Sequence, residues 1–386
     1  MISLGAKQLV ASIERSWGTI AADPSLASGS AGLALTISYL SSAFKGQGYD
    51  VLATDLLRQT ISTIESRVCD WGLLSGYAGI GWVFDLIGHQ TMSTDLKEIA
   101  GDIDAIIESA LTKRNWTTQF DLATGLTGIG LYCLHRCPRD QPLKSMTHVL
   151  RHLRESAVSY PGGLAWLGSP NAHDPQAIDL GMAHGQAGVI TFLSSARAVE
   201  GAPYLPIEGL LLENVSWLTS QFQPDPGSTS WHLPSLVLGD GTLVEGRQGW
   251  CYGDPGVSIS LWNAGSSMAN SSIKQCGLQV GLRAAHQILA ATTLDAGLCH
   301  GSSGLFIIFN HFYNVTREDT FMAAAHRCLE STIQHFTAIY TSPPELRPMD
   351  IAFLSGLAGD LLLLVSIAFP PNPPWEALFL GCPRMI

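Results

Sequence analysis

The stretch SGYAGIGW, residues 75–82, places two glycines three positions apart between a hydroxyl residue and an apolar run. The same G-x-x-G unit with an apolar continuation occurs seven times along the chain. The units are SGSAGLAL from Ser28, SGYAGIGW from Ser75, TGLTGIGL from Thr124, HGQAGVIT from His184, YGDPGVSI from Tyr252, HGSSGLFI from His300 and SGLAGDLL from Ser355. One match carries little weight in a chain with 39 glycines, but seven with the same polar-to-apolar change predict a repeat protein.

The spacing of the units predicts the kind of repeat. The first glycines of successive units are separated by 47, 49, 60, 68, 48 and 55 residues. An interval of about 50 residues holds two helices of ordinary length with short connections. The segment STDLKEIAGDIDAIIESAL, residues 93–111, has apolar residues at helical spacing with charges between them. Each repeat is therefore predicted to be a pair of helices.

A helix pair cannot bury its apolar face alone, so the pairs must stack into an open solenoid or a closed ring. An open stack needs polar end repeats, but the last unit continues into LLLLVSIAF, residues 361–369, which is as apolar as the middle units. We therefore expect an all-α fold in which residues 1–386 form a single α/α toroid domain, with seven inner helices inside seven outer helices. The glycines at the starts of the inner helices would let backbones converge at one end of the ring. Helix dipoles would make that end favourable for thiolates and other anions.

The composition excludes several classes of protein. The chain has 386 residues, of which 46% are hydrophobic and 14% charged, as in a protein with a large core. The net charge of −11 and the lack of a basic run argue against a nucleic-acid partner. The first residues contain no signal-peptide pattern, which predicts a cytoplasmic protein. The apolar stretch IAFLSGLAGDLLLLVSIAF, residues 351–369, carries Asp360 and two central glycines, which favours a buried core helix over a membrane span.

The residue before the first glycine of each unit indicates where chemistry is located. It is a serine or threonine in four units, as suits a helix N-cap, and it is His184, Tyr252 and His300 in the other three. Cys251 and Cys299 stand one position earlier in two of these units, 48 residues apart, and therefore occupy equivalent positions in adjacent repeats. With His300 they make a Cys2His set, which with a fourth position open is typical of a catalytic zinc. Simple packing of buried cysteines remains the alternative.

These motifs resemble those of the lanthionine synthetase C-like family, the lanthipeptide cyclases. The resemblance rests on W-C-Y-G at 250–253, C-H-G at 299–301 and A-H-G at 183–185, in this order on the glycine repeat, and it covers essentially the whole chain. It implies an α/α toroid with one Zn²⁺ held by Cys251, Cys299 and His300. It also implies an enzyme that adds peptide cysteine thiols to dehydroalanine or dehydrobutyrine, forming lanthionine or methyllanthionine thioether rings.

The resemblance further implies catalytic roles for His184 and Tyr252, and by position for Asp121 and Arg247. Zinc would activate the thiol, and a histidine, which titrates near ~6.5, suits both halves of the proton exchange. Asp121 would orient or charge His184, and Arg247 would steady the enolate oxygen. The partner would be a dehydrated precursor peptide, with a separate dehydratase. The 68-residue interval leaves about 20 residues beyond a plain repeat, so no inserted domain is expected.

Three other functions stay open at this stage. A relative within the family would add glutathione to dehydroamino acids on damaged proteins. A non-catalytic, zinc-stabilised peptide-binding scaffold would explain the cysteines and His300 but gives no reason for His184 and Arg247. An α/α-barrel glycoside hydrolase would need two positioned carboxylates, for which Asp121, Asp254 and Asp360 are available, but it would make the cysteines accidental.

Overall fold

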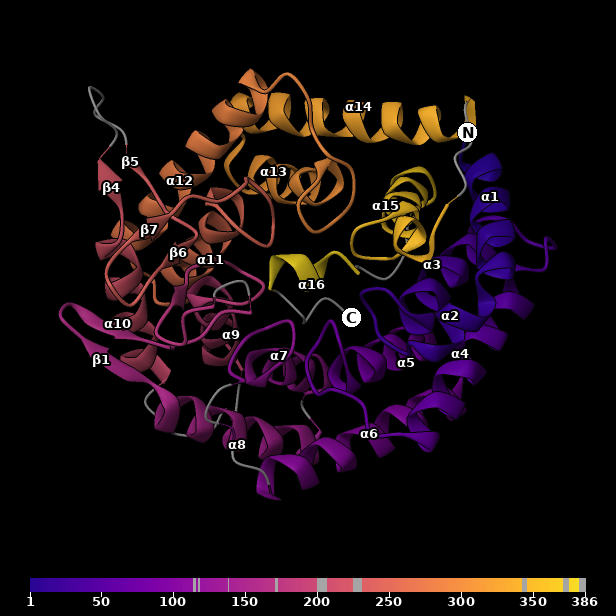
Figure 1. Ribbon diagram of the computed structural model, residues 1–386, viewed down its shortest axis with the longest axis horizontal. Coiled ribbons are helices and arrows are strands. Elements are labelled where there is room, and N and C mark those ends of the chain that lie inside the picture. The colour runs from indigo at the N-terminus through magenta and orange to yellow at the C-terminus, as the bar shows by residue number, and fades with distance from the viewer. Residues whose placement is uncertain are drawn as a thin grey trace.

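The computed structural model describes the chain except residues 114–115, 117–118, 138, 171–172, 200–206, 225–230, 342–345, 371–374 and 382–386. Its helices form a ring within a ring (Figure 1). In the described part of the chain, seven helices make the inner ring, each beginning directly after the first glycine of a G-x-x-G unit. They are α3 (Ser30–Ala43), α5 (Tyr77–Thr91), α7 (Leu126–Arg136), α9 (Gln186–Arg197), α11 (Asp254–Ser267), α13 (Ser302–Thr316) and α15 (Leu357–Ala368). The predicted all-α toroid is confirmed.

Each inner helix has an outer partner, and in every pair but one the outer helix comes after the inner helix in the chain. Six outer helices come after their inner partners: α4 (Tyr49–Ser66), α6 (Thr94–Lys113), α8 (Asp140–Ser156), α10 (Ile207–Ser220), α12 (Ser271–Ala290) and α14 (Asp319–Thr341). The outer partner of α15 is α1 (Ile2–Arg15), from the other end of the chain, which also contacts α14. The short α2 (Trp17–Ala22) follows α1 in the chain and contacts both α1 and α4. The N-terminal helix therefore completes the outer ring, which the sequence pattern did not reveal.

The glycines allow close approach between each inner helix and its own loop. A Cβ on Gly304 would lie 1.9 Å from the carbonyl oxygen of Leu298, and one on Gly128 would lie 2.1 Å from that of Leu122. The second glycine of every unit meets the carbonyl six residues earlier in this way, at 1.9 to 2.4 Å. The predicted crowding is present, but a Cβ on these glycines would meet the backbone of its own unit before it met the neighbouring helix.

Main-chain hydrogen bonds join the loops of successive units. The N–H of Ala27 donates to Leu74 O, and each bond of this kind links the residue two positions before one first glycine to its equivalent in the next unit. The series runs through Ala27, Leu74, Ala123, Ala183, Cys251, Cys299 and Leu354. Leu354 N then donates to Ala27 O at 2.9 Å, which returns the series to its start. The loops are thus tied into a closed circle, and both cysteines are members of it.

Short strands occupy the two longest intervals. They are β1 (Val158–Tyr160), β2 (Gly163–Ala165), β3 (Ile178–Asp179), β4 (Gln223–Pro224), β5 (Trp231–His232), β6 (Leu236–Val237) and β7 (Leu243–Val244). β1 pairs with β2, β4 with β5, and β3 with β6, which in turn pairs with β7, all antiparallel. The β3–β6 pairing ties the loop before α9 to the segment that precedes α11.

The last described segment lies in the middle of the ring. After η1 (Pro348–Ile351) and α15, the helix α16 (Ala377–Leu380) sits near the centre of the view (Figure 1). Trp375 and Phe379 are buried there, and the indole N–H of Trp250 donates to Phe379 O at 3.0 Å. The segment therefore contacts the residue next to Cys251. Among the described residues, no helix combines the length and the apolar character that a membrane span requires.

Candidate metal centre

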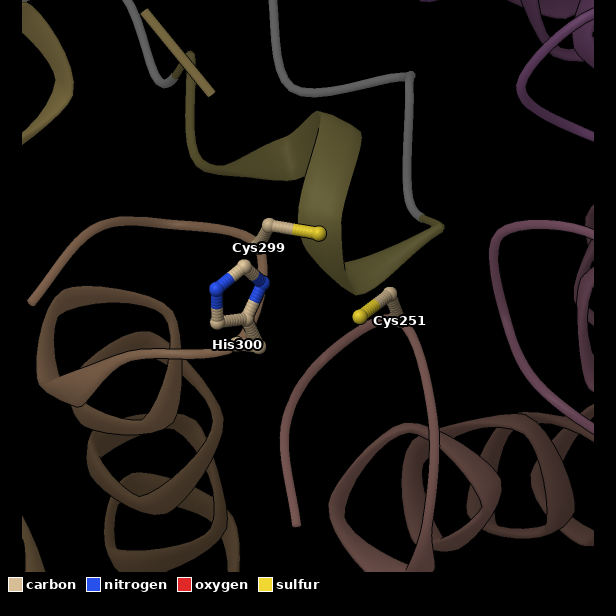
Figure 2. A group of neighbouring side chains, drawn as sticks. All are labelled: Cys251, Cys299 and His300. Atoms are coloured by element: carbon tan, nitrogen blue, oxygen red, sulfur yellow. The ribbon is translucent and has the colours of Figure 1, made fainter. Parts of the chain in front are cut away.

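Cys251, Cys299 and His300 converge from two neighbouring loops. Cys251 lies in the loop before α11, and the other two lie in the loop before α13 (Figure 2). The N–H of Cys251 donates to the carbonyl of Cys299 at 3.1 Å, which holds the two loops side by side. Their potential ligand atoms all lie within 4.8 Å of one another. Two thiols and an imidazole at this spacing fit a tetrahedral metal ion with one position open for a further ligand.

The pKa values of the two thiols are shifted in opposite directions. A hydrogen bond with the Cys299 thiol lowers the pKa of Cys251, burial opposes this effect, and the His300 ring adds to it. The same contact, together with burial, raises the pKa of Cys299. The chain alone therefore favours one thiolate facing one thiol, and a metal ion would allow both sulfurs to be deprotonated.

The side chains of His184 and Asp121 form a hydrogen-bonded pair. The Nδ1 atom of His184 lies 3.2 Å from Oδ2 of Asp121, and both side chains are largely buried. Asp121 also caps the loop before α7, since its Oδ1 accepts from Thr124 N at 2.6 Å. Burial lowers the pKa of His184, but the hydrogen bond and charge of Asp121 outweigh it, with further contributions from Asp179 and Cys251, so the pKa is raised overall.

Tyr252 is hydrogen-bonded to Asp179, a residue that the sequence motifs did not single out. Its hydroxyl donates to Oδ2 of Asp179 at 2.7 Å. Burial raises the pKa of Asp179, while the bonds from Tyr252 and Gly181 and the charge of His184 oppose the rise. Asp179 stands six residues before Gly185, a position that is also aspartate in Asp23, Asp70, Asp295 and Asp350. The recurrence of this aspartate was the only sequence signal that could have pointed to Asp179, although by itself it indicates only a turn shared by the units.

Arg247 stands four residues before Cys251 in the chain. It is exposed and its Nη1 atom is 3.8 Å from Oδ2 of Asp295, which is also exposed. Both line a pocket of about 300 Å³ together with His300, and the apolar wall of this pocket includes Leu294 and Leu305. Arg247 thus shares a pocket with His300, and its charge acts to lower the pKa of Cys299.

Comparisons with known proteins agree with this architecture. The model of the family described as lanthionine synthetase C-like protein matches residues 21–380. Nisin biosynthesis protein NisC of Lactococcus lactis subsp. lactis is 21% identical, over 81% of this chain and 78% of that protein. A solved structure described as nisin cyclase superposes with a TM-score of 0.79 at 18% identity, covering 97% of this chain and 96% of that one, and so shares the fold. The matched family model spans nearly the whole ring, and the chain belongs to the lanthionine synthetase C-like family.

Proposed function

We propose that this chain is a zinc-dependent lanthipeptide cyclase that joins peptide cysteine thiols to dehydroalanine or dehydrobutyrine. The observation that carries the proposal is the Cys2His group, with ligand atoms within 4.8 Å, in the loop circle of a member of this family. Zinc–sulfur and zinc–nitrogen bonds of about 2.3 and 2.0 Å place tetrahedral ligands about 3.5–3.8 Å apart, so small side-chain movements complete the site. The names of the similar proteins, nisin cyclase and NisC, agree with it.

The reaction adds S–H across a carbon–carbon double bond. The sulfur forms a bond to the β-carbon, the π bond breaks, and its electrons move toward the α-carbon and the adjoining amide carbonyl. A proton leaves the thiol for solvent and another is delivered to the α-carbon, so no acid or base is consumed overall. When bound, zinc would supply the Lewis acidity that keeps the incoming sulfur deprotonated and nucleophilic.

His184 is the proton donor in this proposal. Its pKa is raised through Asp121, so it stays protonated to a higher pH than an ordinary histidine. Asp121 also fixes the ring by accepting from Nδ1, which leaves Nε2 to face the substrate. A protonated imidazole in this orientation can deliver the proton to the α-carbon and regain one from solvent.

Arg247 and Tyr252 flank the position of the reacting amide. The guanidinium of Arg247 stabilises the negative charge that develops on the amide oxygen, because it carries a fixed positive charge beside His300. Tyr252 offers its hydroxyl oxygen to the peptide. The substrate is a dehydrated precursor peptide made by a separate dehydratase, and the enzyme acts in the cytoplasm.

The test combines metal analysis with an assay for thioether formation. We expect about one zinc per chain in the wild type and in Cys276→Ala, a half-buried thiol on α12, and loss of zinc in Cys299→Ala. Thioether rings should form on a dehydrated peptide without glutathione, and only in the two zinc-containing proteins. Zinc-free wild type, prepared under reducing conditions, would refute the proposal. Rings that require glutathione would favour the glutathione-adding reaction, and zinc without any addition would favour a binding scaffold.

A further inference from the structure

Asp179 lies deep beside the proposed site, on β3, five residues before His184. It is fully buried. Its carboxylate accepts three hydrogen bonds, from Tyr252 Oη at 2.7 Å, Ser169 Oγ at 2.8 Å and Gly181 N at 2.9 Å. Within the described residues, no lysine or arginine forms an ion pair with it. Burial makes a charged carboxylate costly unless nearby groups compensate for it, so the identity of the donors to Asp179 is informative.

The repeat provides an internal comparison. Asp23 occupies the same position in the first unit, six residues before Gly29. Its Oδ1 accepts from Ser25 N at 2.9 Å, two residues on, as Oδ1 of Asp179 accepts from Gly181 N. Its Oδ2 accepts from Ser28 Oγ at 2.8 Å, within its own loop. The turn is therefore common to both units.

What distinguishes Asp179 is the donor at its second oxygen. There, Asp179 reaches out of its own unit to Tyr252, the residue that follows Cys251. Gly181 packs against the same ring, since a Cβ on it would lie 2.9 Å from Cδ1 of Tyr252. The phenol is thus held at both its ring and its hydroxyl.

The direction of the hydrogen bond limits what Tyr252 can do. A phenol has one proton, and here that proton is given to the carboxylate. The lone pairs of Oη are then the part of the hydroxyl that faces other groups. Tyr252 is therefore suited to accept from a peptide N–H and unsuited to protonate the α-carbon.

We propose that Asp179 is a positioning residue that fixes Tyr252 as a hydrogen-bond acceptor for the substrate beside the metal ligands. The inference rests on the proposed function, because the substrate is the dehydrated peptide. Asp179 would act through Tyr252 and would not touch the peptide itself.

The kinetic test is a double-mutant cycle with a matched control. We expect Asp179→Asn to lower kcat about tenfold with KM and zinc content within about twofold of wild type. In the Tyr252→Phe background the same change should cost less than about twofold, because the residues act as a unit. Asp23→Asn, the equivalent change in the first unit, should leave kcat within about twofold of wild type. The inference would be overturned if Asp179→Asn lowered kcat equally in the wild-type and Tyr252→Phe backgrounds. It would also be overturned if Asp179→Asn and Asp23→Asn lowered kcat equally.

A second measurement does not depend on activity. With 3-fluorotyrosine at position 252, the ¹⁹F resonance should move in Asp179→Asn and stay in place in Asp23→Asn. If Asp179→Asn does not fold, Ser169→Ala serves instead, because it removes the other donor to the same carboxylate oxygen and should also move the line. An unmoved line in the folded variant refutes the contact. If the wild type makes no thioether but the ¹⁹F line still moves in Asp179→Asn, the proposed function is refuted and the contact between Asp179 and Tyr252 is supported.

Discussion

Asp121 combines two tasks in one carboxylate. One oxygen caps the loop before α7 through Thr124 N, and the other binds His184. Replacing it with asparagine keeps an oxygen for the cap but removes the charge that faces the imidazole. The variant is therefore expected to fold and to change mainly the titration of His184.

The first prediction follows from the direction of that pKa shift. Asp121, Asp179 and Cys251 raise the pKa of His184 against burial. If protonated His184 donates to the α-carbon, kcat falls as pH rises through this pKa. Asp121→Asn should move that fall to lower pH, which a pH profile of kcat measures. An unmoved profile would show that His184 is not the group being titrated, and His184→Ala should abolish the fall.

At the residue scale, the sequence predicted positions better than contacts. The adjacency of Cys251 and Cys299 could be predicted because equivalent residues of neighbouring repeats must lie side by side. The contact of Tyr252 with Asp179 could not, because it depends on the side-chain direction across two loops. Five units share an aspartate at that position, and only the structure shows that Asp179 is the one bound by Tyr252.

At the scale of the element, each G-x-x-G unit fixes an inner helix against the loop before it. Gly304 is the second glycine of the unit that carries Cys299 and His300. A Cβ there would lie 1.9 Å from the carbonyl oxygen of Leu298, and a backbone atom cannot rotate away as a side chain can. The loop that carries Cys299 and His300, two of the proposed metal ligands, would have to move.

The second prediction compares two glycine-to-alanine changes in helices. Gly304→Ala should lower the free energy of unfolding by about 3 kcal/mol or more and weaken zinc retention against a chelator. Gly101→Ala, on α6 with open space around the site of the new Cβ, should raise it by about 0.5–1 kcal/mol. Denaturant unfolding measures both. Similar free energies of unfolding for the two variants would show that the loop before α13 accommodates the added methyl group at little cost.

The third prediction concerns the buried carboxylate of α15. Asp360 accepts from Ser303 Oγ and from Gly297 N, yet burial raises its pKa from 3.8 to about 6, with the charge of His335 opposing the rise. The folded state then binds the proton more tightly than the unfolded state. Stability from this group is present below pH 4 and lost as pH rises through about 6.

Asp360→Asn should remove this dependence. Between pH 4 and pH 7 the wild type should lose up to roughly 3 kcal/mol of unfolding free energy relative to the variant. Urea unfolding of both proteins across this range gives the difference directly, and effects of other groups cancel. A difference that does not change with pH would show that Asp360 is ionised at its ordinary pKa in the folded protein.

For the whole molecule, ring closure depends on both ends of the chain. The repeat pattern predicted closure because the last unit is apolar, but it did not show that α1 would supply the missing outer helix. Nor did it place the C-terminal segment, whose proline-rich composition gave no helical period. The structure shows α1 beside α15 and α16 inside the ring, because both cover apolar surface that the repeats leave exposed.

The fourth prediction tests the central segment. Phe379 is almost fully buried, packs edge-on against Trp250 with ring centroids 5.0 Å apart, and contacts Trp375 in the same way at 5.9 Å. Phe379→Ala should therefore cost about 3–5 kcal/mol of unfolding free energy. Because Trp250 precedes Cys251, the change should also speed zinc loss to a chelator and reduce the near-ultraviolet circular dichroism of the tryptophans.

Phe369→Ala is the matched control for this change. Phe369 directly follows α15 as its C-cap residue, is 40% exposed, and packs on Phe44 with ring centroids 5.2 Å apart. Its replacement should cost about 1 kcal/mol and leave zinc loss unchanged, because it lies away from the loop circle. If both variants lose equal stability and retain zinc equally, the central segment covers the ring without supporting the metal loop. A larger cost for Phe379→Ala together with faster zinc loss would show that the centre of the toroid holds the Cys251 loop in place.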